Sequence, residues 1–143
     1  MPARTQAAGA AERLTTVERV RLVAEVLATY AIVRWRLRHT DLPAVLAALR
    51  APGRRGARRL PLAHDERRLT GATVRVLRAL PSDARCLTRS LVVLAMLARR
   101  GSAATLVIAT RPEPSFTAHA WVEHAGRPLL PTEGFGDARL VEL

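Results

Sequence analysis

The sequence predicts an α+β fold in which helices come first and a small antiparallel sheet follows. Its 143 residues, of which 49% are apolar, suffice for one hydrophobic core. Apolar residues recur at helical spacing up to Gly101, and β-type runs replace this spacing after it. We therefore expect a mobile tail at 1–13 and a single domain at 14–143. This domain divides into a helical half, 14–80, and a helix plus sheet, 81–143.

The first two helices are predicted from their N-terminal signals. Thr15 and Glu18 have the spacing of a capping box and precede a helical apolar pattern that runs to about Arg38. Asp41 can cap a second, shorter helix, which has a proline in its first turn and ends near Arg50. The following residues, 51–62, are rich in Pro, Gly and Arg and indicate a loop.

Two further helices are predicted before the sheet. Residues 65–80 place their apolar side chains on one side of a helix. Pro81 interrupts this pattern, and Ser82 or Asp83 can cap a fourth helix that continues to Arg100 and closes at Gly101. The only cysteine of the chain, Cys86, then lies in the first turn of the fourth helix.

Short β-rich runs follow at 105–109, 116–122 and 127–130. Ala125 and Gly126 separate the last two runs and favour a tight hairpin turn. A two-residue turn at this point pairs Glu123 with Pro128.

The net charge of +11 comes entirely from arginine, because the chain contains 23 Arg and no Lys. The chain also contains no Asn. Catalysis through a lysine Schiff base and an asparagine that orients a catalytic histidine are both excluded. The charge favours an anionic partner. The five aromatic residues are too few and too scattered to form a base-stacking platform, which argues against nucleic acid.

Several other classes of protein are disfavoured. The longest uncharged apolar runs, 26–33 and 91–98, are far shorter than the roughly 20 residues that cross a bilayer. A single cysteine excludes an internal disulfide framework and a multi-thiolate metal site. No secretory signal and no phosphate-binding glycine loop is present, so we expect a cytoplasmic protein without a cofactor, a metal or a membrane partner.

Cys86 and His119 are the candidate catalytic residues. Unpaired N–H groups at a helix start stabilise a thiolate and make it nucleophilic. A lone cysteine can also be a small buried hydrophobic residue. His119 lies in an alternating segment and shares one strand face with Trp121 and Glu123, where it could serve as the base for a cysteine nucleophile.

These residues carry a resemblance to a known family. Cys86-Leu87-Thr88-Arg89-Ser90-Leu91 and Ala118-His119-Ala120-Trp121-Val122-Glu123 resemble the transglutaminase-like leader peptidases of lasso-peptide biosynthesis, which are related to the microcin-processing protein. The resemblance covers residues 80–143 and implies a transglutaminase- or papain-like fold. It also implies that Cys86 is the nucleophile and that His119 is the general base and acid.

The third catalytic residue departs from the family pattern. The family places an Asp on the strand after the histidine strand, but residues 129–133 contain none. Regular pairing would set His119 opposite Thr132 and turn Glu133 to the other face, unless the strand is irregular near Pro131. The candidates, in order of preference, are Glu133, Thr132 and Asp137.

The leading hypothesis is a cysteine peptidase that removes the leader from a ribosomally made lasso-peptide precursor. The resemblance implies three partners: the precursor through its leader, a separate leader-binding protein and a macrolactam-forming synthetase. Trp121 and Phe116 are the expected substrate contacts. Two alternatives stay open, an acyltransferase on the same fold and a non-enzymatic Arg-rich adaptor that binds peptide or RNA.

Overall fold

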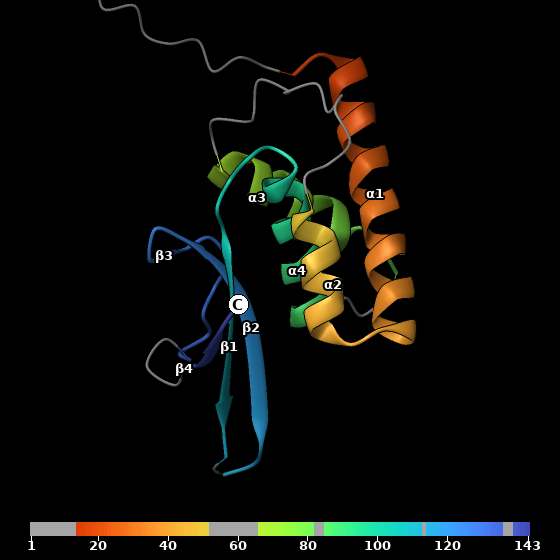
Figure 1. Cartoon of the computed structure of the whole chain (residues 1–143). Coiled ribbons are helices and arrows are strands. Elements are labelled where there is room, and N and C mark those ends of the chain that lie inside the picture. The colour runs from red at the N-terminus through yellow and green to blue at the C-terminus, as the bar shows by residue number, and fades with distance from the viewer. Residues whose placement is uncertain (1–13, 52–65, 82–84, 113, 136–138) are drawn as a thin grey trace, which may run out of the picture.

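The computed structural model describes residues 14–51, 66–81, 85–112, 114–135 and 139–143, and it confirms the α+β fold (Figure 1). The expected tail at 1–13 lies outside these residues. The helices are α1 Thr16–His39, α2 Leu42–Arg50, α3 Glu66–Arg78 and α4 Cys86–Ala98. The strands are β1 Thr105–Arg111, β2 Thr117–His124, β3 Arg127–Pro128 and β4 Arg139–Glu142.

The predicted signals at the starts of α1 and α2 are confirmed. The backbone N–H of Glu18 donates to Thr15 Oγ1 at 3.3 Å, and the backbone N–H of Thr15 donates to Glu18 Oε2 at 2.7 Å. The backbone and side-chain hydrogen bonds from Thr15 lower the pKa of the Glu18 carboxyl. At the start of α2, Asp41 accepts from the backbone N–H of Ala44 at 3.0 Å.

Helix α4 begins later than predicted, although Cys86 is still in its first turn. Its N-cap is Arg85, whose side chain makes no capping hydrogen bond. The prediction that Ser82 or Asp83 caps this helix is therefore wrong, because a capping side chain must come directly before the first helical residue to reach its N–H groups. Ser82 and Asp83 themselves lie outside the described residues.

Helix α4 is the centre of the molecule. It contacts the three other helices and both central strands, and every residue from Ser90 to Leu97 is buried. Figure 1 shows α1 on the outer side of the helical layer and the sheet on the opposite side of the molecule. A helix buried on all sides needs apolar residues around its whole circumference, which the run 91–97 supplies. No helix in the described part of the chain combines the length and the apolar character that a bilayer span requires.

The four strands form an antiparallel sheet in the order β3-β2-β1-β4. The hairpin turn before β3 is confirmed, with positive φ at Ala125 (49°) and Gly126 (73°), as the tightest hairpin turns require. The predicted pairing of Glu123 with Pro128 is also confirmed. All seven residues of β1 pair with β2, with Ala109 opposite His119.

Two features of the sheet differ from the prediction. The expected strand 127–130 is only Arg127–Pro128, and after the hydrogen bond from Leu129 N–H to Val122 O the chain leaves β2. Strand β4 was not predicted. It has four residues and pairs with β1, more than 25 positions earlier in the chain, so no local sequence pattern marks it.

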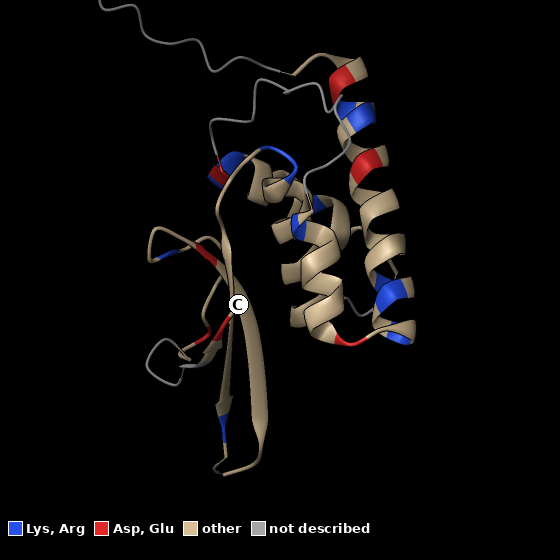
Figure 2. Ribbon diagram, in the orientation of Figure 1, with Lys and Arg blue, Asp and Glu red and all other residues tan. Residues whose placement is uncertain are grey.

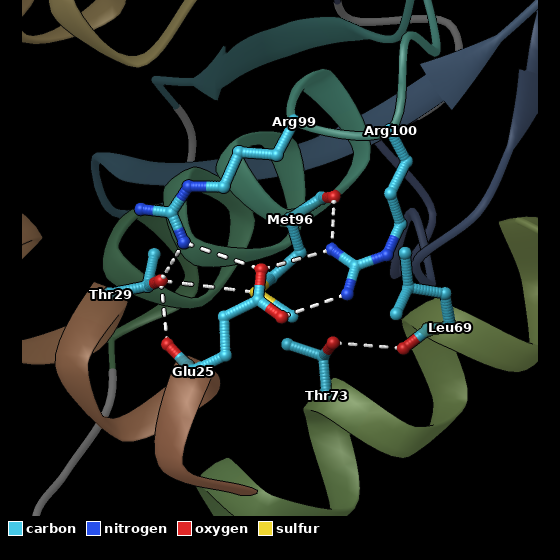
Figure 3. A network of polar contacts seen from close by, with 7 residues as sticks. All are labelled: Glu25, Thr29, Leu69, Thr73, Met96, Arg99 and Arg100. Atoms are coloured by element: carbon cyan, nitrogen blue, oxygen red, sulfur yellow. Dashed lines mark hydrogen bonds and ion pairs between the residues drawn. The ribbon is translucent and has the colours of Figure 1, made fainter. Parts of the chain in front are cut away.

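A polar network fastens α1 to the C-terminal end of α4 (Figure 3). The Glu25 carboxylate accepts from Arg100 at 2.8 and 3.1 Å and from Arg99 at 3.5 Å. Arg99 also donates to the Thr29 hydroxyl at 2.7 Å, and Arg100 donates to the Met96 carbonyl at 2.9 Å. The Arg100 side chain is only 6% exposed, so its charge depends on this single carboxylate within the network.

Glu25→Ala is expected to destabilise the fold because it leaves the Arg100 charge buried without a carboxylate. We expect a loss of about 2–3 kcal/mol in the free energy of unfolding, since Glu25 is partly solvated and a fully buried pair costs about 3–5 kcal/mol to break. Urea unfolding followed by circular dichroism measures this. Arg99→Ala is the control, because it leaves Glu25 and Arg100 paired and should cost less. Equal losses of stability from the two variants would contradict the conclusion that the buried charge of Arg100 depends on Glu25.

Candidate active site

Cys86 is half-buried at the first position of α4. Its helix is fixed against β2 one turn later, where the Ser90 hydroxyl donates to the backbone carbonyl of Ala120 at 2.9 Å. Residues four apart lie on the same face of a helix, so Cys86 is on the face of α4 that meets β2. Ala120 directly follows His119 in the chain.

A second contact sets the direction of α4 relative to β2. Glu66, the first residue of α3, accepts from the Ser102 hydroxyl at 2.6 Å and lies 2.6 Å from His124 Nδ1. Through Glu66, the chain just after α4 is therefore joined to His124, the last residue of β2. The start of α4 therefore points toward the start of β2, and Cys86 and His119 lie at the same end of the α4–β2 contact. Within the described residues, no hydrogen bond joins the thiol to the imidazole.

The His119 ring is buried and held in one orientation. Its Nε2 lies 2.8 Å from the Pro131 carbonyl oxygen, which can only accept, so Nε2 carries a proton. The ring stacks on Trp121 at 5.8 Å and contacts Phe135 at 5.6 Å between ring centroids. In the neutral ring, Nδ1 then keeps its lone pair and is the atom that can accept a proton.

Glu133, the first candidate for the third catalytic residue, is near His119, but on the side of Nδ1. Its Oε2 lies 3.7 Å from Nδ1, and its side chain is 63% exposed. The expected irregularity near Pro131 is present, because Glu133 (φ 50°) and Gly134 (φ 80°) adopt left-handed conformations and form a turn. Regular strand pairing would have turned Glu133 to the other face.

The atom that orients Nε2 belongs to the backbone and was not predicted. The resemblance led us to expect an acidic side chain, but the Pro131 carbonyl occupies the position beside Nε2. Every residue has a carbonyl, so residue types gave no signal for it. Thr132, the second candidate, accepts at its backbone carbonyl from Phe135 N–H at 2.9 Å. Asp137, the third candidate, lies outside the described residues.

The prediction that Trp121 contacts the substrate is wrong. Its side chain is fully buried, and its indole N–H donates to Glu123 Oε1 at 2.8 Å. Alternation places Trp121 beside His119, but the packing turns both rings into the interior, where Trp121 supports the imidazole. Phe116 precedes β2 and is exposed, so its role as a substrate contact stays a prediction.

Arg111 holds the turn that carries Glu133. Its guanidinium lies 4.5 Å from the centroid of the Phe135 ring and donates to the Gly134 carbonyl at 2.8 Å. Phe135 in turn contacts the His119 ring. Neither Arg111 nor Phe135 was predicted to belong to the site, because an arginine in an arginine-rich chain and a lone aromatic residue carry no specific signal.

Among the residues that the structure describes, no group of three or more His, Cys, Asp or Glu is arranged to hold a metal ion. His119 and Glu123 are four positions apart, an offset that brings two side chains together on a helix but separates them along a strand such as β2. The Glu123 carboxylate accepts from the Trp121 indole instead, and His124 pairs with Glu66.

Comparison with known protein families gives the identity of the fold. A family model described as the transglutaminase-like superfamily matches residues 24–138. The chain belongs to the transglutaminase-like superfamily. Members of this superfamily are typically catalytic, as cysteine proteases or transferases, and the matched region includes both Cys86 and His119. Searches of curated proteins and of solved structures found no match.

Glu133→Gln is expected to lower the turnover of this transglutaminase-like protein about 10-fold. A carboxylate near Nδ1 stabilises the imidazolium form, but solvent screens so exposed a group, which sets the effect at the lower end of the roughly 10–100-fold losses for groups that support a catalytic side chain. The loss should fall on kcat and leave KM unchanged. Thr132→Val is the comparison, and an equal loss there with none from Glu133→Gln would move the role to the hydroxyl.

Proposed function

We propose that this transglutaminase-like protein is a cytoplasmic cysteine peptidase that removes the leader from a lasso-peptide precursor. The observation that carries the proposal is the ordered His119 ring, with Nε2 bonded to the Pro131 carbonyl, at the end of β2 toward which the start of α4 points. Cys86 is the only thiol of the chain and begins that helix. The motifs around both residues support the narrower assignment to leader removal.

The proposed reaction is acyl transfer through a thioester. The Cys86 thiol gives its proton to His119 Nδ1, and Sγ attacks the carbonyl carbon of the scissile peptide bond. Collapse of the tetrahedral intermediate breaks the C–N bond, and Nδ1–H protonates the leaving amine. Water then attacks the thioester carbon and gives a proton to Nδ1, and collapse of this second tetrahedral intermediate breaks the C–S bond. The departing sulfur takes the proton back from Nδ1, and the carboxylic acid product releases its own proton to solvent as it leaves.

Nδ1 is suited to this role because Nε2 is already committed to the Pro131 carbonyl. The imidazolium formed after the first proton transfer still donates from Nε2 to Pro131 O, and the Glu133 carboxylate, 3.7 Å from Nδ1, partly offsets the positive charge of the ring. The histidine therefore does not need to rotate between accepting the thiol proton and passing it to the leaving amine.

Substrate affinity is proposed to come from a separate leader-binding protein. The buried Trp121 offers no surface to a peptide, which leaves Phe116 as the large exposed contact near β2. A partner that binds both the leader and this protein raises the effective substrate concentration to about the millimolar range. A ring-closing synthetase would then take the released core peptide.

The test is cleavage of a precursor, measured by mass spectrometry with and without the leader-binding protein, at low and high NaCl. The partner is expected to lower the apparent KM about 100-fold or more and to change kcat little. This gain should shrink above roughly 0.15 M salt, where exposed arginine contacts are screened. Tight, salt-insensitive leader binding by this chain alone would contradict the division of roles.

The same assay separates the two alternatives. Product that forms only after an amine is added indicates an acyltransferase. An adaptor gives no product under any condition, and its cysteine should barely react with iodoacetamide at pH 6, whereas a nucleophilic Cys86 should be alkylated rapidly.

A further inference from the structure

Helix α1 exposes an apolar stripe on the side that faces away from the core. Its inner face is buried through Leu22, Val26, Thr29 and Val33. The opposite side carries apolar residues at alternating spacings of three and four, followed by a final step of four. We call this set the outer stripe, and all of its members are exposed: Val17, Val20, Ala24, Leu27, Ala31 and Trp35.

The outer stripe concentrates exposed apolar surface on one helix. Of the eight large hydrophobic residues that are exposed in the described part of the chain, six lie on α1 and four of these belong to the outer stripe, among them Trp35, which is 60% exposed. A helix at the surface of a monomer normally has a polar outer face. An apolar stripe there is typical of a surface that binds another protein.

The spacing of the stripe identifies the kind of structure that fits it. Apolar residues at alternating intervals of three and four form the seam of a two-helix coiled coil. The small Ala24 and Ala31 on either side of Leu27 allow a second helix to approach closely. The alternating part of the stripe, from Val17 to Ala31, supplies about two heptads of such a seam within the 24 residues of α1.

The charges beside the outer stripe indicate that the partner is negatively charged. Arg21, Arg34 and Arg38 border it, each three residues from a member of the stripe. Both carboxylates of α1 are already engaged: Glu18 in the capping box and Glu25 with Arg99 and Arg100. Figure 2 shows the acidic residues of α1 only in its N-terminal half and basic residues at its C-terminal end.

We propose that the outer stripe binds an acidic amphipathic helix of a partner protein. A second copy of this chain fits less well, because it would bring arginines against arginines on a protein of net charge +11. α1 packs on α2, α3 and α4 and lies on the outer side of the helical layer, away from the strands (Figure 1). A helix docked there would leave the His119 region open. The outer stripe could therefore bind its partner whether or not Cys86 and His119 cleave a precursor.

A designed peptide tests the surface directly. The probe is a helical peptide of three heptads with Ile and Leu at the a and d positions and Glu at e and g, and the control peptide has Lys in place of Glu. Trp35 reports binding, because its exposed indole should shift its emission to shorter wavelength when covered, while Trp121 is already buried. Trp35→Phe should remove this signal. The Glu peptide is expected to bind at least 10-fold more tightly than the Lys peptide, with the difference decreasing as salt rises.

A matched pair of variants locates the binding site. Leu27 and Val141 are both 38% exposed, but only Leu27 belongs to the outer stripe. Leu27→Ala should weaken binding of the Glu peptide about 10-fold, and Val141→Ala should leave it unchanged. Arg38→Glu should weaken the Glu peptide and strengthen the Lys peptide.

Two results would overturn the proposal. The first is equal binding of the two peptides, or no shift of Trp35 emission up to about 1 mM of the Glu peptide. The second is a dimer of the chain alone, seen by sedimentation and dissociated by Leu27→Ala, which would make a second copy the occupant. Circular dichroism of each variant verifies that the exposed substitutions leave the fold intact.

Discussion

Cys86→Ala and Cys86→Ser are expected to abolish cleavage of the precursor, with product below the detection limit of a mass-spectrometric assay. The substitution removes the atom that forms the thioester, and no other thiol in the chain can replace it. The packing cost should be small, because Cys86 is only half-buried and α4 has no side-chain cap that the change could disturb. Circular dichroism and the urea midpoint of both variants should therefore match the wild type.

Ser90→Ala is an informative companion to the Cys86 variants. It removes the hydroxyl that fixes α4 to the Ala120 carbonyl without touching the nucleophile. We expect a loss of about 1–3 kcal/mol in stability, because the carbonyl loses its buried partner, with residual turnover in the folded fraction. Full cleavage by folded Cys86→Ala would overturn the peptidase assignment.

His119→Ala is expected to lower the rate at least 10²-fold, the loss that follows removal of a general acid–base group. A thiolate can attack without a base, but the leaving amine still needs a proton, and His119 Nδ1 is the proposed donor. Glu133 is a poor substitute because its side chain is largely exposed to solvent and is not held against the reacting atoms.

The His119 variant needs a structural control, since the ring also packs on Trp121 and Phe135. His119→Gln fills more of this space and still lacks the acid–base nitrogen, so it should lose the same activity with a smaller change in the unfolding midpoint. His39→Ala, at the exposed end of α1, should keep the wild-type rate. A folded His119→Ala enzyme that retained more than about a tenth of the rate would show that the catalytic pair is wrong.

The sequence alone predicted the structure correctly where the signal depends on residues close together in the chain. The capping box of Thr15 and Glu18 and the Asp41 cap depend on residues within one helical turn of each other, and both formed as predicted. The Ala125-Gly126 turn fixed the pairing of Glu123 with Pro128 for the same reason, because a two-residue turn leaves one register. The change from helical to alternating spacing after Gly101 determined the α+β fold.

The surroundings of the histidine were decided by tertiary structure. The sequence singled out His119, but its hydrogen-bond partner is a backbone carbonyl that no residue type announces, and Glu133 approaches it only because the chain turns through positive φ after Pro131. Alternation placed Trp121 on the same face as His119 without revealing that this face is covered. Strand β4 and the Glu25–Arg100 pair join segments far apart in the chain. Short-range patterns determine which elements form, whereas burial and long-range contacts depend on how those elements pack, and only the folded chain contains that information.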